Sequence, residues 1–173
     1  TEYLYYTSDY SGNKNANESC EVTYDELKKI SRLETPQNVL AVFKMPVYEG
    51  VAINPEELTL ALDGIQDAGN MGTIIRIADW FGINNIFASK NTVDIYNPKV
   101  VQATMGALAR VSVHYVDNLG DMLQQMQKAD YPIYGTLLDG KDMYEPTAIP
   151  TKDKGIIVMG NEGNGISPEV REL

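Results

Sequence analysis

Short apolar runs alternate with amphipathic stretches along most of this chain, and this order limits the fold more than any other feature. Each run is short enough for a buried strand, and the stretches between them carry apolar residues at helical spacing. Strands that alternate with helices at this rhythm predict an α/β fold, with an open, mostly parallel sheet and helices on both faces. The apolar runs cover residues 58–62, 86–88, 111–116, 133–138 and 156–159.

A clear helical pattern follows the first of these runs. We expect Asn70 to cap this helix and Gly82 to end it. Arg76 lies four residues after Gly72, so its side chain should lean back over the glycine, where no side chain blocks it. A guanidinium beside the free amides of a helix start suits a phosphate or a developing oxyanion. The apolar residues expected to face away from Arg76 are Ile74, Ile77, Ala78 and Phe81.

A loop with three glycines, written GNEGNGI, follows the last apolar run as Gly160–Ile166. Ligands of α/β sheets bind at the carboxyl ends of parallel strands, and glycines let a ligand approach the backbone amides closely. Glu162 is the only acid in the loop. We therefore expect a binding site here, and we expect Arg76 and this loop to face one shared cleft.

Both features have plainer alternatives, which the sequence leaves open. The glycine loop can be a strand-to-helix turn in which glycine supplies positive φ and nothing binds. Arg76 can form a surface ion pair with Asp79, worth less than about 1 kcal/mol, with Asn70 as an ordinary helix cap. The glycine spacing G-x-x-G-x-G also differs from the G-x-G-x-x-G of dinucleotide folds, which disfavours a nucleotide-binding redox domain.

The first 46 residues have a different character. Four tyrosines lie within the first ten residues, and they could stack on bases or form a partly buried edge. A short helix is expected over residues 25–31 and a strand over residues 39–43. We therefore divide the chain into the remnant of a small α/β N-terminal domain at 1–46, a linker at 47–56 and a larger domain at 57–173.

Composition excludes several classes of protein. No apolar run approaches 18 residues, so we expect no membrane span. One cysteine, Cys20, excludes an internal disulfide and a multi-cysteine metal site, and it suits a reducing cytoplasm. The one histidine, His114, lies in an alternating apolar run, where a place in a sheet is expected. We expect no metal.

Four ordered segments of the sequence resemble the SpoU branch of the SPOUT RNA methyltransferases. They read LDGIQDAGNMGTIIRIADWFG, SKNTVDIYNPKVVQATMGAL, IYGTLLDG and IIVMGNEGNGIS. A fifth segment, ISRLETPQNVLAVFKMP, resembles the end of the small substrate-binding domain that precedes the methyltransferase domain in that family. The resemblance implies transfer of a methyl group from S-adenosylmethionine to a ribose 2′-hydroxyl of structured RNA, either rRNA or tRNA.

The resemblance also implies roles for particular residues. Arg76 matches the catalytic arginine of the family, Asn70 the asparagine beside it and Glu162 the acid of the second motif. The family pairs as homodimers near the active site, so a homodimer is expected by analogy. The residues expected to bind S-adenosylmethionine are Thr136, Leu137, Leu138, Gly160, Asn161, Gly163, Gly165 and Ile166.

Two features depart from the family pattern. The third motif of the family, which forms a knot, would come after Leu173, so we expect a sequence cut at both ends and a weak or inactive enzyme. The net charge of −10 is unusual for an RNA-binding protein, although residues 70–112 hold four basic and two acidic residues, a local charge of +2. A non-catalytic RNA-binding module with the same fold therefore remains the alternative.

Overall fold

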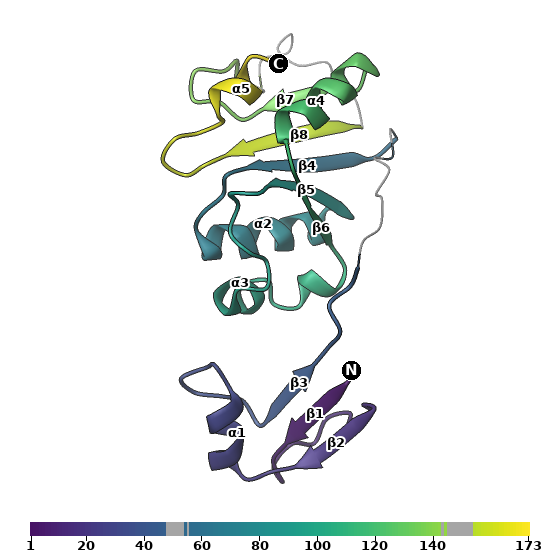
Figure 1. Ribbon diagram of the computed structural model, residues 1–173, viewed down its shortest axis with the longest axis vertical. Helices are drawn as coiled ribbons and strands as arrows, with labels where there is room; N and C mark the ends of the chain where they lie inside the picture. The colour runs from purple at the N-terminus through teal and green to yellow at the C-terminus, as the bar shows by residue number, and fades with distance from the viewer. Residues whose placement is uncertain (48–53, 55, 143, 145–153) are drawn as a thin grey trace. The chain divides into compact units, whose positions relative to one another are not determined.

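A computed structural model describes residues 1–47, 54, 56–142, 144 and 154–173. The chain divides into two compact units, Thr1–Glu49 and Gly50–Leu173, which are described separately (Figure 1). Most of the linker expected at 47–56 lies outside the described residues.

The second unit is built on a five-stranded sheet in the order β6-β5-β4-β8-β7 (Figure 1). Every pair of neighbouring strands in it is parallel. The predicted α/β fold with an open parallel sheet is therefore confirmed. The strands are β4 (Leu58–Asp63), β5 (Asn85–Ser89), β6 (Ser112–Val116), β7 (Ile133–Gly135) and β8 (Gly155–Gly160).

Helices cover both faces of this sheet, each over its own apolar cluster. Because side chains alternate along a strand, Leu60 and Leu62 of β4 join one cluster while Ala61 joins the other. The first cluster packs under α2 and α3, and the second packs under α4 and α5 (Figure 1). The helices are α2 (Ala68–Trp80), α3 (Pro98–Ala103), the 3-10 helix η1 (Ala107–Ala109), α4 (Leu119–Lys128) and α5 (Pro168–Arg171).

The buried face of α2 differs from the prediction. Ile74 and Ala78 are buried as expected, together with Met71, Gly72 and Ile75. The interpretation was wrong for two residues, because the side chain of Ile77 is 47% exposed and that of Phe81 is 71% exposed.

Close packing of α2 on α3 explains this difference. A Cβ atom on Gly72 would lie 2.3 Å from the Cβ of Ala103, so the glycine lets the two helices touch. The expected open surface over Gly72 is therefore filled by α3. The helix cap was also misplaced by three residues: Asp67 is the N-cap, and its carboxylate accepts a hydrogen bond from the Asn70 amide at 2.7 Å.

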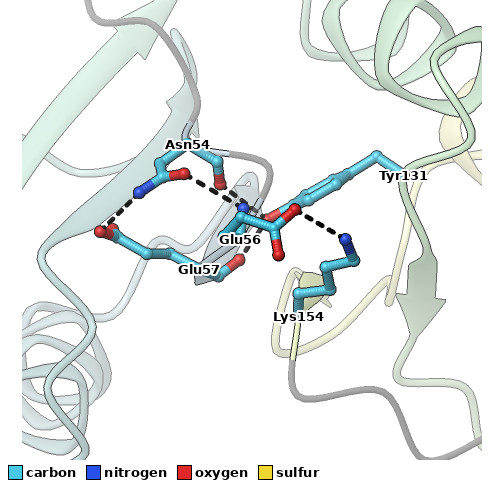
Figure 2. Close-up of polar contacts among 5 residues, drawn as sticks. All are labelled: Asn54, Glu56, Glu57, Tyr131 and Lys154. Carbon is cyan, nitrogen blue, oxygen red and sulfur yellow. Dashed lines mark hydrogen bonds and ion pairs between the residues drawn. The ribbon is translucent and has the colours of Figure 1, made fainter.

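The strand beginnings at the amino edge of the sheet are tied together by polar contacts (Figure 2). The buried Tyr131, just before β7, donates through its hydroxyl to the carbonyl of Glu57, just before β4. Lys154, just before β8, forms an ion pair with Glu56 at 2.9 Å. The side-chain oxygen of Asn54 accepts a hydrogen bond from the Glu56 amide at 3.1 Å, and its side-chain nitrogen donates to the Glu57 carboxylate at 2.8 Å. These contacts hold the beginnings of the strands together at the amino edge. The loops expected to bind a ligand lie at the opposite, carboxyl edge.

The first unit is a three-stranded sheet in the order β2-β1-β3 with one helix, α1. The tyrosine-rich segment forms the central strand, which pairs parallel with β2 and antiparallel with β3. The sequence predicted the helix and the last strand within two residues but missed the first two strands. The elements are β1 (Tyr3–Tyr6), β2 (Glu18–Glu21), α1 (Tyr24–Ile30) and β3 (Val39–Val42).

Candidate functional site at the carboxyl edge of the sheet

The carboxylate of Glu162 joins two loops that follow neighbouring strands. Glu162 comes just after β8, and it accepts hydrogen bonds from the backbone amides of Gln66 and Asp67, just after β4, both at 3.1 Å. It also accepts a hydrogen bond from the side-chain amide of Asn70 in the first turn of α2, at 3.2 Å. Asn70 and Glu162, two of the three residues expected to be catalytic, are therefore in direct contact.

These contacts determine the charge state of Glu162. Partial burial raises the pKa of this carboxyl, but the hydrogen bonds from backbone amides and from Asn70 outweigh burial, so the pKa is lowered. The positive end of the α2 dipole favours the same charge. Glu162 is therefore a carboxylate at neutral pH and a weak proton acceptor.

The glycine loop is folded back on itself by Asn161. The backbones of Asn161 and Gly165 exchange two hydrogen bonds of 2.8 Å. The side-chain oxygen of Asn161 accepts from the amides of Gly163 at 3.0 Å and Asn164 at 2.9 Å. Four loop amides are thus bonded within the chain, so a ligand here would meet carbonyl oxygens more than amides.

The three glycines of the loop serve different purposes. A Cβ on Gly160 would lie 2.2 Å from the backbone of Gly165 and Ile166, so the fold itself requires this glycine. Gly165 has a φ of +70°, which favours glycine. A Cβ on Gly163 would meet the Asn161 side chain at an ordinary 3.6 Å, the one contact within 4 Å among the described residues. A strand-to-helix turn without a ligand is enough to explain why glycine stands at positions 160 and 165. The fold does not require glycine at position 163.

The loop after β4 is held from its other side as well. The amide of Gly64, where φ is +74°, donates to the buried hydroxyl of Ser89 at 2.8 Å. The Gly64 carbonyl accepts from the side chain of Asn161 at 2.7 Å. Asp63, at the end of β4, accepts from the amide of Ser167 at 2.7 Å. Both loops are therefore held in place without a ligand. No sequence pattern predicted these roles of Ser89 and of the Asn161 side chain.

Some of the residues expected to bind the cofactor line a hollow of about 320 Å³ beside β7 and β8. Leu137 and Ile166 form part of its apolar wall, together with Val158. Thr136 is bonded through its amide and its hydroxyl to the Val158 carbonyl, both at 3.0 Å. Leu138 is fully exposed and does not line the hollow. The volume lies at the lower end of the range for small-ligand sites.

Arg76 lies on the exposed side of α2 with a free guanidinium. Within the described part of the chain it forms no ion pair and no hydrogen bond. The alternative of an Arg76–Asp79 pair is wrong, because Asp79 binds Arg110 through two hydrogen bonds of 2.8 and 2.7 Å. The hydrogen bond from Arg110 lowers the pKa of Asp79.

Among the described residues, Arg76 and the glycine loop do not line one shared cleft. Arg76 lines a second hollow, between the end of α2 and the segment after α3, separate from the hollow that Leu137 and Ile166 line. Arg76 comes six positions after Asn70, about 9 Å along the helix axis. No group of three or more His, Cys, Asp or Glu side chains among the described residues is placed to hold a metal ion. Over the same ranges, no helix combines the length and apolar character needed to cross a membrane.

The loop glycines give a matched pair of substitutions. Gly160→Ala should lower the free energy of unfolding by about 1–3 kcal/mol, because the new methyl group meets backbone that cannot move aside. Gly163→Ala should change it by less than about 0.5 kcal/mol. Denaturant unfolding measures both. Equal losses in the two variants would contradict this account of the loop.

The Glu162 contacts predict a pH-dependent difference in stability. Glu162→Gln should lower the free energy of unfolding by about 1 kcal/mol at pH 7, since the charged hydrogen-bond acceptor is lost. Because the folded pKa lies below the ordinary 4.5, the contribution is complete above pH 4.5 and disappears as the pH falls through the lowered pKa. The two unfolding curves should therefore converge in acid. The exposed Glu34→Gln serves as the control, and a difference that persists in acid would argue against the ionised contact.

The sequence of the second unit matches one known family. Residues 57–173 match the SpoU rRNA Methylase family. The Bacillus subtilis 23S rRNA (guanosine(2553)-2'-O)-methyltransferase RlmP is 29% identical over 148 residues, which are 86% of this chain and 57% of that enzyme. The chain thus spans a little more than half the length of this relative.

Solved structures give the same result. A Porphyromonas gingivalis protein assigned to the TrmH family of RNA methyltransferases is 41% identical, with a TM-score of 0.84 over 99% of this chain and 69% of that one. The AdoMet-bound rRNA methyltransferase from Sinorhizobium meliloti is 28% identical, with a TM-score of 0.78 over 99% of this chain and 67% of that one. The architecture, the joined loops and these similarities together show that the chain belongs to the SpoU rRNA methylase family.

Proposed function

We propose that the protein transfers a methyl group from S-adenosylmethionine to the 2′-hydroxyl of a ribose in structured RNA, with rRNA as the favoured class. The observation that carries the proposal is the contact of Glu162 with the start of α2, because it joins the two segments that hold the expected catalytic residues. The family and the rRNA methyltransferases named above support the same activity.

The residues at the carboxyl edge fit S-adenosylmethionine, which supplies an electrophilic methyl group when bound. Leu137 and Ile166 offer apolar cover, and the loop carbonyls offer acceptors for amine and hydroxyl groups. The space beside Gly163 is not filled by its own loop, so a ligand can approach the backbone there closely. We assign the binding to the Thr136–Leu138 segment and to Gly160, Asn161, Gly163, Gly165 and Ile166.

Arg76 is proposed to act on the RNA. A guanidinium stays protonated in proteins, so Arg76 serves poorly as a base but can hold a phosphate and stabilise negative charge on the 2′-oxygen. Its exposure and its lack of an ion pair among the described residues leave its charge available. Stabilisation of this kind contributes a few kcal/mol, roughly 3, to the barrier in a dry site.

Glu162 and Asn70 are proposed to position the site. The lowered pKa of Glu162 makes it a poor general base, but its hydrogen bonds hold Asn70 in one orientation. The side-chain oxygen of Asn70 then remains free to accept a hydrogen bond from RNA, since the amide nitrogen is the atom bound to Glu162.

We also propose that the protein is a homodimer that works in the cytoplasm. In one chain Arg76 and two of the proposed cofactor residues, Leu137 and Ile166, line separate hollows, and a second copy can bring that cofactor hollow next to Arg76. An RNA substrate and a single exposed cysteine, Cys20, favour a reducing compartment.

Replacement of Arg76 tests the proposal most sharply. In the intact enzyme, Arg76→Ala should abolish methyl transfer, while the affinity for S-adenosylmethionine should stay within about twofold because the arginine lies apart from the hollow lined by Leu137 and Ile166. Isothermal titration measures the affinity, and mass spectrometry of digested rRNA measures the 2′-O-methylated nucleosides. Lys128→Ala, which removes the same charge from the end of α4, is the control and should keep its activity.

The other outcomes separate the alternatives. An equal collapse of cofactor affinity in Arg76→Ala would overturn the role given to this residue. An unaltered chain that binds RNA but neither S-adenosylmethionine nor NAD would be a non-catalytic RNA-binding module. Binding of NAD would indicate the redox alternative.

A further inference from the structure

The glycine loop holds the single Asn-Gly pair of the chain, formed by Asn164 and Gly165. An asparagine before a glycine is prone to deamidation, because glycine has no side chain to shield the backbone amide that attacks. The side chain of Asn164 is exposed and forms no hydrogen bond within the described part of the chain. Its carboxamide can therefore react whenever the backbone allows it.

Deamidation at such a pair needs no partner other than water. The Gly165 nitrogen attacks the side-chain carbonyl carbon of Asn164, so a new nitrogen–carbon bond closes a succinimide ring. The side-chain amide leaves as ammonia and takes the proton that the Gly165 nitrogen loses. Water then opens the ring at one of its two carbonyls. The product is aspartate or, when the backbone runs through the former side chain, isoaspartate.

The folded loop opposes the first step of this reaction. The Gly165 amide, which would attack, donates to the Asn161 carbonyl at 2.8 Å. The Asn164 amide donates to the side-chain oxygen of Asn161 at 2.9 Å, so one residue holds the backbone on both sides of the reacting side chain. Attack requires the Gly165 nitrogen to give up its hydrogen bond and the backbone to rotate into line with the carbonyl carbon. Asn164 therefore reacts only when the loop opens.

The contacts that close the loop are weaker than those that hold the sheet. Residues 162–165 are all exposed, and Ile166 is the first buried residue after them. Hydrogen bonds at the surface close the loop, without buried apolar side chains of its own. Segments of this kind open locally, at a lower free energy than the whole domain unfolds. The rate of deamidation thus depends on the fraction of chains in which the loop is open.

Isoaspartate does not fit the closed loop. It adds one atom to the backbone between residue 164 and Gly165. A Cβ on Gly160 would lie 2.2 Å from the Gly165 carbonyl carbon, so the two backbones already touch and leave no space for a longer connection. Aspartate keeps the backbone length and adds a negative charge two residues after the ionised Glu162. Isoaspartate is therefore the more damaging product.

We propose that Asn164 is a deamidation site controlled by the hydrogen bonds of Asn161. The residue is protected while the loop is closed, reacts when the loop opens and, as isoaspartate, keeps the loop from closing again. This modification does not depend on the proposed function. One consequence does rest on it: because the same loop is assigned to S-adenosylmethionine, bound cofactor should slow the reaction.

The first test compares the folded chain with the same chain in urea, at equal pH and temperature. Peptide mapping by mass spectrometry measures asparagine, aspartate and isoaspartate at position 164 over time. Asn164 should react at least about tenfold more slowly in the folded chain, because only the open loop is reactive. Equal rates with and without urea, or no deamidation in urea, would overturn the inference.

Two substitutions separate opening of the loop from a general loss of stability. Asn161→Ala removes the side-chain acceptor of the loop amides and should speed deamidation of the folded chain by about 5- to 50-fold. Asn97→Ala removes the side-chain cap of α3 and is the control, with an expected change of less than about twofold. Equal acceleration in both variants, or in neither, would contradict control by Asn161. The comparison in urea uses the unaltered chain and decides the question even if Asn161→Ala does not fold.

Addition of S-adenosylmethionine separates the inference from the proposed function. At about ten times the dissociation constant measured by isothermal titration, it should slow deamidation of the folded chain about tenfold. If S-adenosylmethionine does not bind, but the folded chain reacts more slowly than the chain in urea, the proposed function fails while the inference stands. If it binds, but Asn164 reacts equally fast in the folded chain and in urea, the inference fails while cofactor binding stands.

Discussion

The structure of the site depends on one carboxylate, Glu162, which accepts hydrogen bonds from three donors in the loop before α2 and in its first turn. Hydrogen bonds to an ionised acceptor are stronger than neutral ones, and here three of them converge at a helix end that favours negative charge. The contact fixes Asn70 in the first turn of the helix that also carries Arg76. A single ionised group thus links the cofactor loop to α2.

The two edges of the parallel sheet have different tasks. At the amino edge, Tyr131 and the Lys154–Glu56 pair fasten the beginnings of three neighbouring strands (Figure 2). At the carboxyl edge, polar side chains hold the loops in shape but leave carbonyl oxygens for ligands. Asn161 shows how this is achieved, because one side chain closes its own loop and also holds Gly64 of the neighbouring loop.

Much of the second unit could be predicted because its central strands β5, β4 and β8 are mostly buried on both faces, so each reads as an apolar run between polar loops. The first two strands of the other unit gave no such signal. All four residues of β2 are exposed, and solvent exposure removes the selection for apolar residues that marks a strand. The faces of α2 were misassigned for a related reason: Ile77 and Phe81 are apolar but exposed, so helical spacing alone could not tell a buried face from an exposed one.

The candidate residues could be found in the sequence, but their contacts could not. Which acid pairs with Arg110 and what fills the space over Gly72 depend on residues distant in the sequence. The cap of α2 is a local feature, but both aspartate and asparagine are common helix caps, and the prediction chose Asn70 where the structure has Asp67.

The central claim is that S-adenosylmethionine binds at the carboxyl edge of the sheet, that RNA contacts Arg76 on α2, and that Glu162 links the two. Backbone amide chemical shifts recorded during titration with S-adenosylmethionine test it directly. The account predicts large changes at residues 136–138 and 160–166, smaller ones at Gln66 and Asp67, and none at Arg76. Changes centred on Arg76, with the glycine loop unaffected, would contradict it.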